Sequence, residues 1–241
     1  MGLYMNIIWE GIKQAAILLF TGNREVYEIL LMTIRVSGVS LIFSVLLGIP
    51  LGIEIGLNKF RGKGLITTIV NTGMSIPPVA VGLIITLMIW RSGPLGNLEL
   101  MYTPTAMIIA QIIIASPIIT GITIAAIQQV NNKLILQAQT LGANRIQMFW
   151  ILLKEIKLSI LVAIAAGFGR AISEVGAVLI VGGNIMGKTR VLTTATIQMI
   201  RMGKYDTAIA LVVILLLLSF GINFFINAIQ RKEGISWMPR S

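Results

Sequence analysis

The sequence predicts an all-helical protein embedded in a membrane, and three observations lead to this prediction. Hydrophobic residues occupy 56% of the 241 positions, charged residues only 12%, and the mean hydropathy is +0.91. A helix crosses a bilayer with about 20 mostly apolar residues, and several stretches of the chain reach that length. Lys and Arg lie mainly at the ends of those stretches, so the net charge of +10 does not indicate a nucleic-acid partner.

Five core spans are expected, separated by polar segments. Their approximate bounds are residues 29–57, 65–90, 104–127, 159–181 and 208–229. Pro77 and Pro78 in the second span and Pro117 in the third are expected to break their helices, because proline lacks a backbone donor and bends a helix. Residues 182–207 are expected to form a re-entrant or surface segment, and residues 231–241 a tail.

The N-terminal residues 1–26 mix apolar side chains with Glu10, Lys13 and Arg24. The apolar run at residues 14–20 is too short to span a bilayer. No small-residue cleavage site follows it, which argues against a signal peptide. We expect an amphipathic helix lying at the membrane interface, with a short sixth span as the alternative.

The chain contains no cysteine and no histidine. Disulfides, thiolate or imidazole metal sites and histidine-based catalysis are therefore excluded. A membrane enzyme would need a cluster of nucleophile, base or metal ligands, and the sequence shows none.

Residues 131–157 form the longest polar interruption of the apolar chain. Helices are expected over residues 134–141 and 144–157, with a break at Gly142, because glycine readily takes the left-handed conformation that closes a helix. An ordered helix–glycine–helix between spans suggests a surface on which another protein docks. A solvated helix pair without a partner is the alternative.

The distribution of basic residues predicts the orientation of the chain. The loop at 58–64, the stretch at 131–157 and the C-terminus together carry ten Lys or Arg, whereas the N-terminal segment and the segments 91–103 and 182–207 carry seven. The positive-inside rule places the side with ten charges in the cytoplasm. Five spans then place the N-terminus outside and the C-terminus inside.

Residues 182–189 match the phosphate-binding pattern G-x-x-x-x-G-K-[ST]. A nucleotide site of that kind needs a preceding strand and an aspartate from a second strand to hold magnesium. The single aspartate of the chain, Asp206, follows Lys204 and Tyr205 rather than an apolar strand. We therefore expect no nucleotide at this loop.

Arg170 and Glu174 lie inside the expected fourth span, four residues apart, where they would share one helix face and could pair. Charged groups inside a span are costly and usually face a bundle interior or a cavity. We interpret Arg170 and Glu174 either as a structural ion pair or as a site at which Arg170 lines an anion path. Four basic residues on the outer side could attract a dianion by their field, although ordinary surface exposure explains each singly: Lys188, Arg190, Arg201 and Lys204.

The pattern A-x-T-L-G-A at residues 138–143 resembles the cytoplasmic coupling loop of ABC-importer permeases, in which a short permease helix sits in a cleft of a separate ATPase. That loop usually begins with Glu-Ala-Ala and ends, after the glycine, with Ile-x-Leu-Pro. This chain has Leu136-Gln137-Ala138 at the opening and Leu152, Lys154 and Glu155 at the close, so the match rests on the glycine, its neighbours and the spacing. The coupling residues implied are Leu136, Gln137, Ala138, Thr140, Leu141, Gly142 and Ala143.

The block at residues 168–177, continued by residues 181–185 and 189–194, resembles the oxyanion branch of these permeases, which carries molybdate, tungstate or sulfate. The sequence of this block is most similar to that of tungstate-uptake permeases. The substrate-path residues that we assign on this resemblance are Arg170, Glu174, Gly183, Asn184, Arg190 and Thr193.

The resemblance implies a type I ABC-importer transmembrane domain over residues 27–230, acting as a homodimer in the inner membrane. It implies two further partners, a cytoplasmic ATPase dimer that holds ATP and magnesium, and an extracytoplasmic protein that delivers tungstate. The chain itself would bind no cofactor and catalyse no reaction. A molybdate or sulfate permease of the same type is the nearest alternative. An ion-gradient secondary transporter is the more distant one, because it would normally show intramembrane acids and an internal repeat.

Overall fold

The computed structural model describes residues 2–235, and the side chains of residues 9–231. That part of the chain is helical, with short connections. The helices are α1 (Gly2–Phe20), α2 (Arg24–Leu57), α3 (Lys63–Met74), α4 (Pro78–Ile89), the 3-10 turn η1 (Gly96–Leu98), α5 (Pro104–Gln128), α6 (Asn132–Thr140), α7 (Arg145–Glu155), α8 (Lys157–Ile172), α9 (Gly176–Gly182), α10 (Leu192–Arg201) and α11 (Tyr205–Ile235).

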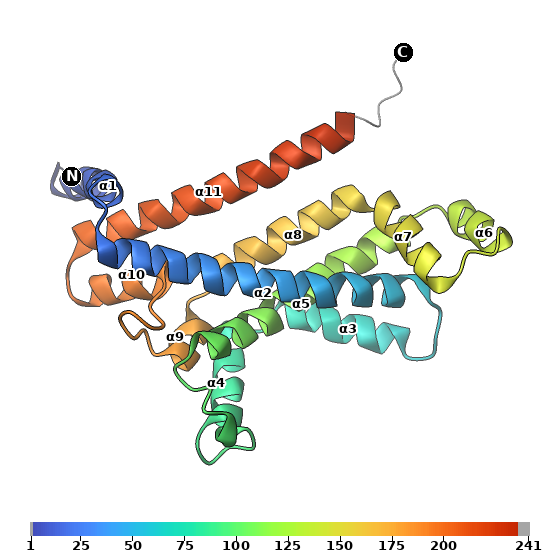
Figure 1. The fold of residues 1–241 in the computed structure, drawn as a ribbon, viewed down its shortest axis with the longest axis horizontal. Helices are drawn as coiled ribbons and strands as arrows, with labels where there is room; N and C mark the ends of the chain where they lie inside the picture. The colour runs from blue at the N-terminus through green and yellow to red at the C-terminus, as the bar shows by residue number, and fades with distance from the viewer. Residues whose placement is uncertain (1, 236–241) are drawn as a thin grey trace.

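Long helices run along one common direction (Figure 1). Three of the described helices, α2, α5 and α11, are long and apolar enough to cross a membrane. The pairs α3–α4 and α8–α9 raise the number to five if each bent pair counts as one span. Length and composition therefore agree with the expected multi-pass membrane protein.

A row of glycines brings α2 against α5. Gly48, Gly52 and Gly56 are four residues apart and therefore share one face of α2. A Cβ atom at Gly52 would lie 2.5 Å from Cβ of Thr123, and one at Gly48 would lie 2.9 Å from Cγ2 of Ile119. Small residues at such spacing let two helix backbones approach closely within a membrane.

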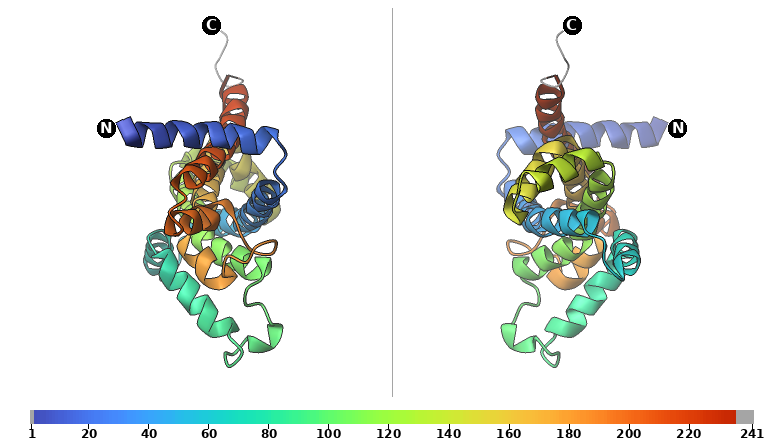
Figure 2. Two further views of the ribbon diagram at one scale, coloured as in Figure 1. Left: turned by 90° about the vertical axis from the view of Figure 1, so that its left-hand side faces the viewer. Right: turned by 90° about the vertical axis from the view of Figure 1, so that its right-hand side faces the viewer.

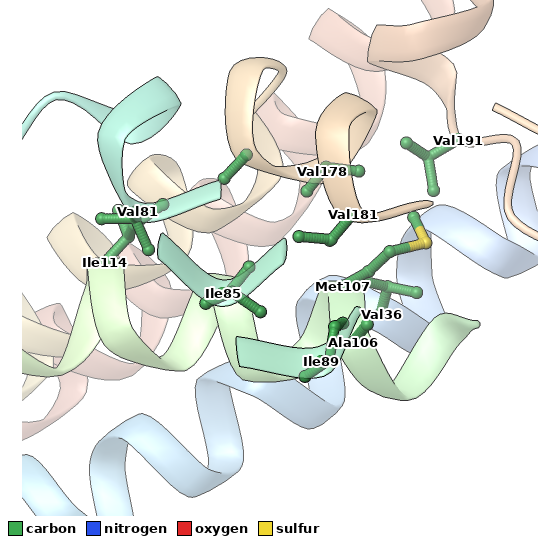
Figure 3. Packing of buried hydrophobic residues seen from close by; sticks show 12 residues of the cluster. Val36, Val81, Ile85, Ile89, Ala106, Met107, Ile114, Val178, Val181 and Val191 are labelled. Carbon is green, nitrogen blue, oxygen red and sulfur yellow. The ribbon is translucent and has the colours of Figure 1, made fainter. Parts of the chain in front are cut away.

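Buried apolar side chains form three clusters along the molecule. One joins α4 and α9 to α5, with Met107, Val178 and Val181 at its centre (Figure 3). A second joins α6, α7 and α8 to α2 and α5, and includes Leu152 and Ile119. The third joins α1, α2, α10 and α11. The polar segments at both ends of the bundle are thus packed on the spans.

The expected break at Pro77 and Pro78 is confirmed. Pro77 caps α4 and Pro78 is its first residue, a position that tolerates proline because the first helical N–H has no intrahelical partner. The axes of α3 and α4 differ by 100°. Helix α4 consequently leaves the common direction of the bundle (Figure 1).

The expected break at Pro117 is wrong. Helix α5 continues through this residue from Pro104 to Gln128. A single proline removes only one backbone donor, and neighbouring helices in a bundle can accommodate that loss.

The expected continuous helix at 159–181 is also wrong, because α8 ends at Ile172 and α9 begins at Gly176 with a bend of 53°. Helix α10 was not predicted either. It lies within residues 182–207, which were expected to form a re-entrant or surface segment. Its residues Leu192–Thr196 are buried.

Helix α1 lies across the long direction of the bundle (Figure 2). The choice between an interfacial helix and a short sixth span stays a prediction. At the other terminus, α11 continues to Ile235. The remainder of the expected tail, residues 236–241, lies outside the described residues.

Candidate functional site

The stretch at residues 131–157 folds as a helix, a glycine turn and a second helix, as expected. Asn131 begins α6 by accepting a hydrogen bond from the backbone N–H of Lys133 at 2.9 Å. The helix closes at Gly142, whose φ of +76° is left-handed, and the N–H of Ala143 donates to the carbonyl of Ala138 at 3.0 Å. The conformation at Gly142 is one that residues with a Cβ adopt at a cost.

Helix α7 has its own start signal and an apolar anchor. Asn144 and Gln147 form a reciprocal capping box, which satisfies two backbone donors at the helix start. Met148 and Leu152 are buried in the second apolar cluster together with Ala138. The stretch is therefore fixed to α2, α5 and α8 by one face.

The opposite face of the stretch is open. Leu136, Gln137, Thr140 and Leu141 line a shallow groove on α6 with Lys133, and Leu141 is 87% exposed. Of the seven coupling residues expected from the sequence, these four share the groove, Ala138 faces the core, and Gly142 and Ala143 form the turn. An exposed apolar tip held by a rigid anchor is suited to docking on another protein.

The expected pairing of Arg170 with Glu174 is wrong. The helix ends between the two residues, so they do not share a helix face, and the structure shows no ion pair between them. The carboxylate of Glu174, which is 4% exposed, instead accepts a hydrogen bond from the N–H of Ala177 at 3.0 Å. It thereby satisfies a free donor in the first turn of α9.

Thr193 is brought to the same break from α10. Its hydroxyl donates to the backbone carbonyl of Glu174 at 3.0 Å. Glu174 and Thr193, two of the residues expected on the substrate path, are therefore in direct contact. Arg170 lies on the preceding helix, and its Nε is buried without a hydrogen-bond partner among the described residues.

The loop after α9 is tightly wound. Gly183, Asn184 and Gly187 have φ values of +70°, +52° and +71°, and the Asn184 amide donates to Gln198 of α10 at 2.7 Å. Thr189 is fully buried. Its hydroxyl donates to the carbonyl of Gly182 at 2.6 Å and accepts from the N–H of Ile185 at 2.9 Å.

This geometry differs from that of a phosphate-binding loop. Helix α9, rather than a strand, precedes the loop, and the Thr189 hydroxyl that would bind magnesium is used inside the loop. The sequence match at residues 182–189 therefore reflects the composition of a compact turn.

Arg190 connects this loop to the first residues of α2. Its Nη1 donates to the Glu25 carboxylate at 3.1 Å, and its side chain is 10% exposed. Sequence reasoning missed Glu25 as a site residue, because 165 positions separate the two partners and no local spacing links them.

A buried polar link between three helices was missed as well. The Ser40 hydroxyl on α2 donates to Gln111 on α5 at 2.8 Å, and the Gln111 amide donates to the carbonyl of Ala171 at 3.0 Å. Ala171 lies in the last turn of α8, where carbonyls lack intrahelical partners. Two signals in the sequence pointed to this face: the spacing of Ser37, Ser40 and Ser44 on α2, and the one Gln inside the third span.

Comparisons with known proteins place the chain among membrane components of importers. Residues 48–234 match the family described as binding-protein-dependent transport system inner membrane component. The tungstate uptake system permease protein TupB of Peptoclostridium acidaminophilum is 40% identical over 95% of this chain and its own full length. The protein of the same name from Campylobacter jejuni is 34% identical over 95% of this chain and 96% of its own length.

Solved structures show the same fold at lower identity. A chain of a bacterial alginate ABC transporter, solved in complex with a periplasmic protein that binds an alginate pentasaccharide, aligns with a TM-score of 0.79 at 22% identity, over 96% of this chain and 88% of that one. A chain of the inward-facing MetNI methionine ABC transporter aligns with a TM-score of 0.71 at 20% identity, over 90% of this chain and 97% of that one. At these identities the likeness concerns the fold, which is that of a type I ABC-importer transmembrane domain.

Proposed function

Because the chain belongs to the family of binding-protein-dependent transport system inner membrane components and is a multi-pass permease subunit of an oxyanion ABC importer, we propose that its oxyanion is tungstate. The observation that carries the proposal is the whole-length similarity to the two tungstate uptake permeases, at 40% and 34% identity. The molybdenum transport permease ModB of Escherichia coli is 27% identical over 73% of this chain and 80% of its own length. Tungstate is therefore favoured over molybdate.

The chain acts as the moving part of the importer, and a separate ATPase dimer, holding ATP and magnesium, supplies the energy. The groove on α6 is the proposed docking surface, with Leu141 as its apolar anchor. Movement of α6 reaches the spans because Ala138 packs in one cluster with Leu152 of α7 and Ile119 of α5. The breaks at 75–77 and 173–175 are the proposed hinges.

A second copy of the chain completes the translocation path, and an extracytoplasmic binding protein delivers the anion. Exposed apolar side chains on α3 and α4, including Leu65, Ile69 and Leu83, are available for the second copy or for lipid. The end that carries α6 and α7 faces the cytoplasm, and the loop at 183–190 faces outside, as the positive-inside rule requires.

Truncation of the coupling anchor tests this proposal. Leu141→Ala should lower ATP-driven tungstate uptake about tenfold or more in proteoliposomes that contain the permease, its ATPase and its binding protein, because buried apolar anchors dominate protein interfaces. Co-purification of the ATPase should weaken in parallel, while the amount of permease in the membrane stays unchanged.

Leu46→Ala is the matched control, because Leu46 is an exposed leucine on the span α2 and does not line the groove on α6. It should leave uptake and ATPase binding at the wild-type level. Normal coupled uptake in Leu141→Ala would contradict the docking surface. Wild-type uptake that prefers molybdate or sulfate over tungstate in competition would contradict the assigned substrate.

A further inference from the structure

A small cavity opens between the start of α2 and the loop that follows α9. Its volume is about 220 Å³, several times the roughly 30 Å³ that one water molecule occupies in the liquid. It is large enough for a small hydrated ion. The lining residues that carry charge are Glu25, Glu28, Arg35, Lys188 and Arg190.

The charges around this cavity are unequally neutralised. Glu25 is held by Arg190 at 3.1 Å, and Glu28 by Arg24 at 2.9 Å. Arg35 and Lys188 make no ion pair or side-chain hydrogen bond within the described part of the chain. Both carboxylates are therefore engaged while two cations remain available, so the cavity carries a positive potential.

Arg190 is the buried cationic side chain of the site. Its side chain is nine-tenths buried, and its Nε has no hydrogen-bond partner among the described residues. Burial of an unpartnered donor is costly. An anion that enters the cavity could accept from this guanidinium, which offers several donors in a fixed plane.

The loop backbone fixes the position of Arg190. The carbonyl of Ile185 accepts hydrogen bonds from the N–H groups of Lys188, Thr189 and Arg190, at 3.2, 2.9 and 3.0 Å. Val191, the next residue, is buried in the apolar cluster of α4, α5 and α9 (Figure 3). The guanidinium thus stands on a rigid support, which lowers the entropic cost of binding a ligand.

We propose that this cavity is an entry site for a tetrahedral oxyanion dianion, bound by Arg35, Lys188 and Arg190, and that Glu25 competes with the anion for Arg190. The inference rests on the proposed function in naming tungstate as the ligand. In the empty site, Glu25 occupies the guanidinium. An arriving dianion displaces this carboxylate, and the competition keeps binding weak enough for release into the path.

The competition predicts opposite effects for two neutral substitutions. Tungstate binding is measured by equilibrium dialysis on the purified permease–ATPase complex without its binding protein. Arg190→Gln should weaken binding about tenfold or more, because it removes charge-assisted hydrogen bonds. Glu25→Gln should tighten binding several-fold, because it removes the competing carboxylate and its negative charge.

Lys188→Gln is the second test of the site, because Lys188 is exposed on the loop and its side chain makes no described contact that folding would need. It should weaken binding several-fold. Arg91→Gln is the matched control: it removes one positive charge from an exposed loop on the same side, but Arg91 does not line the cavity. Its effect should stay within about twofold at physiological salt, since exposed charges are screened beyond a Debye length.

Three results would overturn the site. The first is no measurable tungstate binding by the wild-type complex, the second is unchanged binding in both Arg190→Gln and Lys188→Gln, and the third is weaker binding in Glu25→Gln. These outcomes would leave the importer itself in place if wild-type tungstate uptake remained sensitive to Leu141→Ala. Normal uptake in Leu141→Ala would instead contradict the proposed coupling, whatever the cavity binds.

Discussion

Thr189 holds the loop between α9 and α10 through one hydroxyl group. This hydroxyl donates to the carbonyl of Gly182 and accepts from the N–H of Ile185, and the side chain is fully buried. Thr189→Val keeps the shape but leaves both backbone groups without a partner, at a cost of about 1–3 kcal/mol for each buried group. We expect a lower midpoint of thermal unfolding for the purified protein in detergent.

Thr189→Ser is the control for this prediction, because serine keeps the hydroxyl and removes only a methyl group. Its unfolding midpoint should lie closer to that of the wild type than the midpoint of Thr189→Val does. Equal midpoints for Thr189→Val and the wild type would show that the two hydrogen bonds do not stabilise the loop.

Single residues were predicted less well than their surroundings. Glu174, Asn184, Arg190 and Thr193 were assigned to a substrate path, which stays a prediction, and the structure shows that Glu174 contacts Thr193. The assumed partner of Glu174 was wrong because the spacing of four residues has meaning only inside a continuous helix. The partner of Arg190 lies on another helix, and such a contact depends on tertiary packing.

At the scale of helices, the close approach of α2 and α5 depends on the glycine row. A Cβ atom at Gly52 would lie 2.5 Å from Cβ of Thr123 and 2.9 Å from the carbonyl oxygen of Thr120. Gly52→Ala should therefore push the two helices apart and destabilise the protein by about 1–3 kcal/mol, the usual cost of overpacking. The measurement is the midpoint of thermal unfolding, together with the yield of monodisperse protein.

Gly38→Ala provides the matched comparison on the same helix, because a Cβ atom at Gly38 would meet nothing within 4 Å. Alanine has a higher helix propensity than glycine, so this variant should be as stable as the wild type or slightly more stable. Equal destabilisation by both substitutions would mean that glycine flexibility, rather than close packing, matters on α2.

Helices were predictable where hydrophobicity or capping residues mark them. The long apolar stretches predicted α2, α5 and α11, and Gly142 predicted the turn between α6 and α7. Helix α10 was missed because it carries three threonines, Thr193, Thr194 and Thr196, which are weak helix formers. Their hydroxyls are satisfied by backbone carbonyls once the helix is packed, a condition that the sequence does not display.

At the scale of the whole molecule, the polar segments gather at two opposite ends. Helices α6 and α7 and the connection between α2 and α3 lie at one end of the bundle, and α1, α10 and the start of α11 lie at the other (Figure 1). Counting of basic residues assigned these same segments to two sides of the membrane. Charge distribution could predict this grouping because the long helices α2 and α11 each carry the chain from one end to the other (Figure 1). Helix α4, which leaves the common direction of the bundle, is an exception.

The orientation can be tested directly because the chain contains no cysteine. Ile146 in α7 and Met202, the residue after α10, are both exposed, and α7 and α10 lie at opposite ends of the bundle (Figure 1). In intact cells whose outer envelope lets the reagent reach the inner membrane, a membrane-impermeant maleimide should label Met202→Cys and leave Ile146→Cys unlabelled. Lysis should make both thiols reactive, which controls for exposure. The reverse pattern would invert the molecule and place the groove on α6 outside the cell, which would contradict the proposed docking of a cytoplasmic ATPase at this groove.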